Sequence, residues 1–190
     1  MALTQGHQVL CCDRNRRGGL KNIWLMSSET NPTSATTLSA TNVYTVFPAS
    51  NVYQFDFDRY TGQFTATGSR ENGSTIVSVE LSFYIPKVTA RVNQRLDELA
   101  STCGLYAVVE TYADDCASPA LTYKFILGYD EIFENDAYLD FSSAEESTGS
   151  ALQDANGVTV TLAGDAALFP AEYSGVMTAG TAYTDAWSMA

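Results

Sequence analysis

The sequence predicts a mainly β protein with one helix, and three observations carry this prediction. Aromatic residues make up 12% of the chain, and eleven Tyr and nine Phe stand beside many Thr, Val and Ser, which suit the pleated surface of strands. Apolar and polar residues alternate over several segments of strand length. A helical spacing of apolar residues occurs clearly in one segment, near residues 88–102.

The chain has the size of a single domain. Its 190 residues are 45% hydrophobic and 17% charged, a balance that allows a sizeable core and is not typical of disorder. We therefore expect one domain over residues 1–190. It would carry an extended loop or arm at 27–50, rich in Ser, Thr, Ala and Asn, and a C-terminal arm at 171–190 without periodicity.

Strands are expected first in the N-terminal half. In residues 53–58 aromatic and polar residues alternate, which predicts one apolar face. In the longest segment, Val77 follows Ile76 directly and breaks the alternation, so we expect a bulge there. Its inward side chains would be Ile76, Val79, Leu81, Phe83 and Ile85. The strands expected in this half are 23–26, 43–46, 53–58, 64–67 and 76–85.

The helix is expected from Thr89 to Thr102. Thr89 can cap its start, and Gly104 can follow its end in the left-handed conformation. One apolar stripe runs along it, formed by Val88, Val92, Leu96 and Leu99. After the helix, strands are expected at 105–111, 123–127, 138–142 and 158–162, with a loop at 112–119 and a turn at 154–157.

Charge is distributed unevenly along this acidic chain. The net charge is -12, and all ten basic residues lie at or before Lys124, while eleven carboxylates follow it. Such a segment repels phosphate, so we expect no nucleic-acid-binding surface there. The N-terminal basic cluster is better suited to pairing with carboxylates on a neighbouring copy of the chain. The candidate inter-subunit contacts are Arg14, Arg16, Arg17 and Lys21.

The sequence contains no recognisable catalytic or cofactor-binding motif. The single histidine, His7, lies in a polar terminal stretch, so a Ser-His-Asp triad or a histidine metal site is not supported. No nucleotide-binding glycine motif is present, and the four cysteines lack zinc spacing and are expected to be reduced. We expect a non-enzyme without metal or cofactor, and, since no signal peptide or membrane span is recognisable, a cytosolic product without membrane contact.

Three pairs of neighbouring carboxylates are candidate catalytic acids and bases. The pairs are Asp56 with Asp58, Asp114 with Asp115, and Glu145 with Glu146. Asp56 and Asp58 would share one strand face that alternates with an aromatic face, and the other two pairs fall in loop-like sequence. We interpret the first pair as solvated charges and the two loop pairs as solvated charges or weak calcium ligands rather than catalysts.

Four segments, in this order, resemble the tail tube proteins of tailed bacteriophages. They are residues 18–25 (Gly-Gly-Leu-Lys-Asn-Ile-Trp-Leu), 53–62 (Tyr-Gln-Phe-Asp-Phe-Asp-Arg-Tyr-Thr-Gly), 70–75 (Arg-Glu-Asn-Gly-Ser-Thr) and 154–161 (Asp-Ala-Asn-Gly-Val-Thr-Val-Thr). The resemblance covers roughly residues 18–165, and the loop from Ser27 to Ser50 and the segment from Ala171 look longer than in that family.

The resemblance implies a rolled β-sandwich or barrel of antiparallel strands with one flanking helix. It implies a virion protein, assembled in the host cytoplasm, that forms stacked hexameric rings in contact with other tail proteins. DNA and the tape-measure protein would pass through the channel without sequence-specific binding. An acidic wall would let a polyanion slide, and the candidate channel-lining residues are Asp56, Asp58 and Glu80.

The sequence is compatible with two groups of alternative functions. Within the same class, the chain could be a tail terminator, a head-to-tail connector or a capsid decoration protein. In a different class, it could be a carbohydrate-binding β-sandwich or a glycosidase-like module. The aromatic platform of such a module would be drawn from Tyr112, Tyr129, Tyr138 and Trp187.

Overall fold

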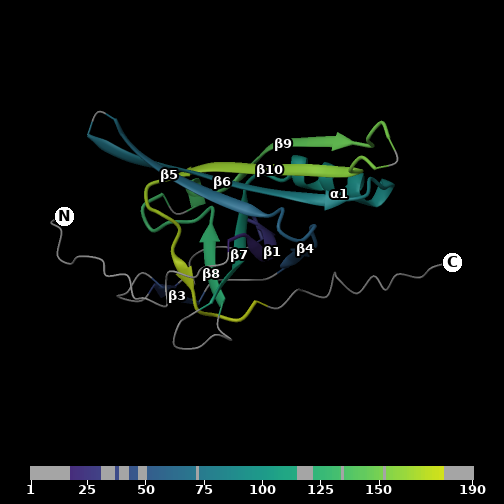
Figure 1. Ribbon diagram of the computed structural model, residues 1–190. Coiled ribbons are helices and arrows are strands. Elements are labelled where there is room, and N and C mark those ends of the chain that lie inside the picture. Colours follow the sequence, from purple (N-terminus) through teal and green to yellow (C-terminus); the bar gives the residue numbers. More distant parts are fainter. Residues whose placement is uncertain are drawn as a thin grey trace.

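Two β-sheets face each other, and one helix lies beside them (Figure 1). The computed structural model describes residues 18–30, 37–38, 43–46, 51–71, 73–114, 122–133, 135–151 and 153–177. The predicted mainly β architecture, a β-sandwich with one flanking helix, is confirmed. Three of the four candidate inter-subunit contacts, Arg14, Arg16 and Arg17, lie outside the described residues. His7 and Trp187 also lie outside them.

The larger sheet has the strand order β2-β3-β11-β8-β7-β1-β4. Neighbouring strands are antiparallel except β11 and β3, which are parallel. The central strands are β1 (Leu20–Ser27), β7 (Leu105–Asp114) and β8 (Thr122–Leu127). The outer strands are β2 (Thr37–Leu38), β3 (Val43–Val46), β4 (Tyr53–Phe55) and β11 (Glu172–Tyr173).

The smaller sheet is fully antiparallel and has the order β5-β6-β10-β9. β5 (Gln63–Glu71) and β6 (Ser74–Pro86) form a long hairpin that reaches past the rest of the sheet (Figure 1). Glu71 pairs with Ser74 at the end of this hairpin, and an Asn-Gly sequence between two strands is typical of a tight turn. β9 (Asp140–Ser147) and β10 (Gly157–Ala166) complete the sheet, after a 3-10 helix at Asn135–Ala137.

The main core lies between the two sheets. Alternate residues of β6 and β10 point into it, because successive side chains of a strand face opposite sides of the sheet. Each fully buried leucine or valine stabilises the fold by about 1.5 to 3 kcal/mol. The almost fully buried residues of the main core include Ile23, Leu25, Val77, Leu81, Phe83, Ala107, Val109, Val158, Val160 and Leu162.

A second core lies on the opposite face of the larger sheet. Residues that alternate with the first core along β1 and β7, such as Trp24, Tyr106 and Val108, are buried there with Tyr44 and Tyr173. β1 and β7 are thus buried on both faces, which explains their nearly continuous apolar sequence. Burial, followed by repulsion from the neighbouring Tyr129, raises the pKa of Tyr106 to about 12.

The helix α1 (Ala90–Ser101) forms where it was predicted. The Thr89 side chain accepts a hydrogen bond of 3.2 Å from the backbone nitrogen of Val92, and Gly104 has a φ of 83°. Leu99 is buried in the main core, while Val88, Val92 and Leu96 pack against it partly buried. The predicted apolar stripe is therefore confirmed.

Four details of the prediction are wrong. Val77 is buried and Ile76 is 43% exposed, because β6 keeps one register with both neighbours and has no bulge at these residues. β4 ends at Phe55, so residues 56–58 belong to no strand. β7 continues to Asp114, where a loop had been expected from residue 112. The short strand β11 was not predicted, and it lies in the segment expected to be an arm without periodicity.

Candidate functional site

The outer face of the β5-β6-β10-β9 sheet is a continuous polar surface. Cross-strand rows place Thr65 beside Glu80 and Ala163, and Thr67 beside Ser78 and Asp165. Most of these side chains are exposed, and they are small hydroxyls or carboxylates. The polar members are Gln63, Thr65, Thr67, Ser69, Ser78, Glu80, Ser82, Asp140, Ser143, Glu145, Thr159, Thr161 and Asp165.

This polar face carries negative charge only. Glu80, Asp140, Glu145 and Asp165 belong to it, and no lysine or arginine is among the described side chains of the face. The Ser78 hydroxyl donates a hydrogen bond of 2.7 Å to Asp165. A hollow of about 540 Å³ lies over the face and includes Asp136 at its rim. The described residues contain no group of three His, Cys, Asp or Glu placed to hold a metal ion.

The predicted channel-lining residues do not lie together. Glu80 is exposed on the polar face, in the middle of β6. Asp56 and Asp58 are also exposed but follow the end of β4, so they do not share a strand face with each other or with Glu80. The backbone nitrogen of Asp58 donates a 2.8 Å hydrogen bond to the Tyr84 carbonyl, at the end of the sheet away from the hairpin.

Both outer strands of the smaller sheet have an edge without a partner strand among the described residues. Within the described part of the chain, β5 pairs with β6 alone and β9 with β10 alone. These edges are 9 and 8 residues long, and most of their side chains are exposed. A long exposed edge is a template for another strand, and monomeric proteins usually blunt it. This sheet can therefore be extended by a strand at either side.

Lys21, the one described member of the predicted inter-subunit cluster, forms an ion pair within its own chain. Its amino group lies 3.0 Å from the carboxylate of Glu110, which is only 6% exposed. Thr122 and Asn22 also donate hydrogen bonds to this carboxylate. Desolvation raises the pKa of Glu110, but the hydrogen bonds from Thr122, Asn22 and Lys21 and the Lys21 charge together outweigh it, so the pKa is lowered overall.

The aromatic residues considered for a sugar-binding platform are dispersed. The Tyr129 ring contacts Tyr106 and Tyr44, with centroids 6.2 and 5.6 Å apart, and packs against the second core. Tyr138 is 36% exposed and precedes β9, and Tyr112 lies on β7. Tyr112 instead contacts Tyr60, with ring centroids 5.5 Å apart.

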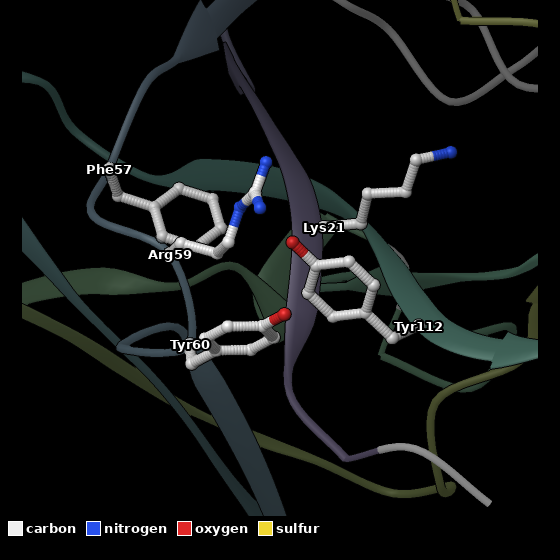
Figure 2. Close-up of a pocket in the computed structure, with 5 residues that line it drawn as sticks. All are labelled: Lys21, Phe57, Arg59, Tyr60 and Tyr112. Atoms are coloured by element: carbon white, nitrogen blue, oxygen red, sulfur yellow. The ribbon is translucent and has the colours of Figure 1, made fainter.

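A hollow at the start of β5 was not predicted from the sequence. It has a volume of about 420 Å³ and is lined by Lys21, Phe57, Arg59, Tyr60 and Tyr112 (Figure 2). These residues come from three distant parts of the sequence, so spacing along the chain could not reveal it. The only available signal was the Phe-Asp-Arg-Tyr-Thr-Gly segment at 57–62, which was noted for its resemblance to tail tube proteins.

An exposed apolar patch at the opposite end of the sheet was also missed. Ile132, Phe133, Leu168 and Phe169 are 62, 41, 41 and 57% exposed. The backbone nitrogens of Ile132 and Phe133 donate to one buried carboxylate, that of Asp130, and so does the nitrogen of Ala167, which precedes Leu168. Phe169 lies over Gly68 of β5, where an added Cβ would come within 2.8 Å of its ring. Clustered apolar side chains at a surface are typical of interaction sites.

The helix in the described residues is too short and too polar to cross a membrane. Comparison of the chain with models of known protein families, with curated proteins and with solved structures gives no significant match.

Proposed function

We propose that the chain is a structural protein of a bacteriophage virion, the subunit of a tail tube in which rings stack around a channel. The observation that carries this proposal is the combination found in one sheet: an acidic polar face without a basic residue in its described part, and a free edge on either side. The resemblance of residues 18–165 to tail tube proteins supports it independently.

The free edges provide a way to close a ring. Three antiparallel pairings separate β5 from β9, so β9 runs antiparallel to β5. β9 of one copy can therefore pair with β5 of the next in the same antiparallel manner that holds the sheet together. Repetition of this heterologous contact closes a ring and leaves no free edge.

The polar face is suited to the wall of the resulting channel. The carboxylates repel DNA phosphates, and the serine and threonine hydroxyls offer no strong cationic contact. Of the sequence-based candidates, Glu80 fits this role by its position, whereas Asp56 and Asp58 lie beyond the strands of the sheet.

The other class considered, a carbohydrate-binding module, is less well supported. Its expected platform is dispersed, because Tyr129 packs against the second core while Tyr112 and Tyr138 lie on different parts of the fold. A binding module also has no need of two long free edges on one sheet, and these remain unexplained unless another strand covers them.

Proline substitution in β9 tests edge pairing. Adjacent residues of an outer strand direct their N–H groups alternately to the paired strand and to solvent, and proline is tolerated where the N–H faces solvent. Of Ser143→Pro and Ala144→Pro, one therefore removes a hydrogen bond to β10 and the other removes only a free donor. The variant that removes only the free donor keeps the melting temperature of the native chain, and it is the variant that tests edge pairing. The variant that loses the hydrogen bond to β10 has a lower melting temperature and serves as its control.

Light scattering and electron microscopy of the purified protein provide the readout. The native chain is expected to form rings, and the well-folded proline variant to remain monomeric. A native chain that stays monomeric at high concentration contradicts the proposed function. Rings formed equally well by the folded proline variant contradict the edge pairing.

A further inference from the structure

The hollow at the start of β5 contains a cation without a partner in the described structure. Arg59 makes no side-chain ion pair with another described residue, whereas Lys21 pairs with Glu110. In Figure 2 the Lys21 amino group points away from the other four side chains, while the Tyr60 and Tyr112 hydroxyls are directed toward the space between them. The hollow thus offers one guanidinium and two hydroxyl donors to an anion.

A strained turn holds Arg59 and Tyr60 in this position. The backbone nitrogen of Thr61 donates a 3.2 Å hydrogen bond to the Asp58 carbonyl, and the Asp58 carboxylate accepts a 2.8 Å bond from the Arg59 nitrogen. Tyr60 has a φ of 67° and is 72% exposed. A bulky residue in the left-handed region is unusual, and such outliers gather at functional sites.

The complementary charge lies on the opposite edge of the same sheet. Glu145 and Glu146 are exposed near the end of β9 and have no described partner. Glu145 is level with Thr159 and Tyr84 across the sheet, and the backbone of Asp58 bonds to the Tyr84 carbonyl. The Arg59 turn and the two glutamates therefore lie at the same height on opposite edges.

This arrangement brings them together when two copies associate. In an antiparallel pairing of β9 with β5 of the next copy, without stagger, the end of β9 meets the turn before β5. Glu145 belongs to the polar face, whereas Glu146, opposite the buried Val158, points to the other side of β9. We infer that the hollow receives the Glu146 carboxylate of a second copy of this chain, with Arg59 as the ionic partner and the hydroxyls of Tyr60 and Tyr112 as hydrogen-bond donors. The inference rests on the proposed ring and names the contact that sets its register.

Charge exchange tests this contact. Arg59→Glu places like charges together, and Glu146→Arg does the same from the other side. Each is expected to raise the protein concentration needed for ring formation by about tenfold or more, as for close charge pairs at an interface. The combined variant is expected to assemble within about threefold of the native chain. Arg95→Glu, which changes the charge of α1 equally, is the matched control and is expected to assemble normally.

The outcomes separate this inference from the proposed function. Rings formed by the native chain and equally by Arg59→Glu overturn the contact and leave the ring in place. The contact is also overturned if the variants on both sides impair ring formation and the combined variant does not restore it. A native chain that forms no ring overturns both. Melting curves verify that each variant is folded, and Arg59→Gln, expected to weaken assembly less than Arg59→Glu, replaces any reversal that unfolds.

Discussion

The carboxylate of Asp130 accepts a 2.7 Å hydrogen bond from the backbone nitrogen of Ala167, 37 positions further along the chain. The same side chain accepts bonds of 2.7 and 2.6 Å from the nitrogens of Ile132 and Phe133, and it is only 3% exposed. It therefore joins the loop after β8 to the end of β10. One buried acid thus ties the two sheets together beneath the exposed apolar patch.

Asp130→Ala is expected to destabilise the protein by about 2 kcal/mol, because three backbone N–H groups lose their charged acceptor. Asp130→Asn, which retains one acceptor oxygen, should cost less. Urea unfolding measures both. Asp136→Ala, on the neighbouring 3-10 helix, is exposed and serves as the control. Equal stability of Asp130→Ala and this control would show that the three hydrogen bonds contribute nothing.

The helix stripe predicts a graded effect. Leu99 is 6% exposed in the main core, so Leu99→Ala is expected to cost about 2 to 5 kcal/mol. Leu96→Ala should cost less, since Leu96 is only partly buried. Gln94→Ala, on the exposed side of the same helix, should change the melting temperature little. A reversed order of the two leucines would contradict the packing described for α1.

Glu110 predicts a pH dependence of stability. Its pKa is lowered from the ordinary value of 4.5 in the folded protein, so its contribution is complete above that value and is lost as the pH falls through the lower folded pKa. Glu110→Gln should cost about 1 to 3 kcal/mol at pH 7 and flatten the acid side of the stability profile. Unfolding measured from pH 3 to 7 would disprove this if both proteins lost stability in parallel.

The negative charge of the polar face predicts that the channel wall binds DNA weakly. Glu80→Lys with Asp165→Lys should leave ring formation intact but create salt-sensitive binding of short duplex DNA, because two carboxylates on the wall become cations. Asp97→Lys with Glu131→Lys changes the charge equally at exposed positions away from that face. Fluorescence anisotropy compares the two pairs. Comparable DNA binding by both would mean that total charge matters and the position on this face does not.

Local patterns predicted most of the elements. Thr89, Gly104 and the apolar stripe located α1 within one residue, because capping and helical spacing are properties of neighbouring residues. Alternation located the long strand 76–85, but its inward residues near Ile76 and Val77 were misassigned. Both are β-branched and apolar, and their difference in burial comes from the register with β5 and β10.

Contacts between distant segments could not be predicted. The buried role of Asp130 is invisible in a sequence where Glu131 and Asp136 stand nearby as exposed acids. The second core depends on a strand at 172–173 that is too short to show a period. The hollow around Arg59 is assembled from β1, β7 and the turn before β5, and Lys21, expected to bind a neighbour, pairs within its own chain.

Cryo-electron microscopy of the assembled protein, at a resolution that traces strands, tests the central claim most directly. The account predicts closed rings in which the β5-β6-β10-β9 sheets join edge to edge, with Glu80 and Asp165 facing the channel. A protein that remains monomeric at high concentration, or a ring whose channel is lined by another face of the molecule, would contradict it.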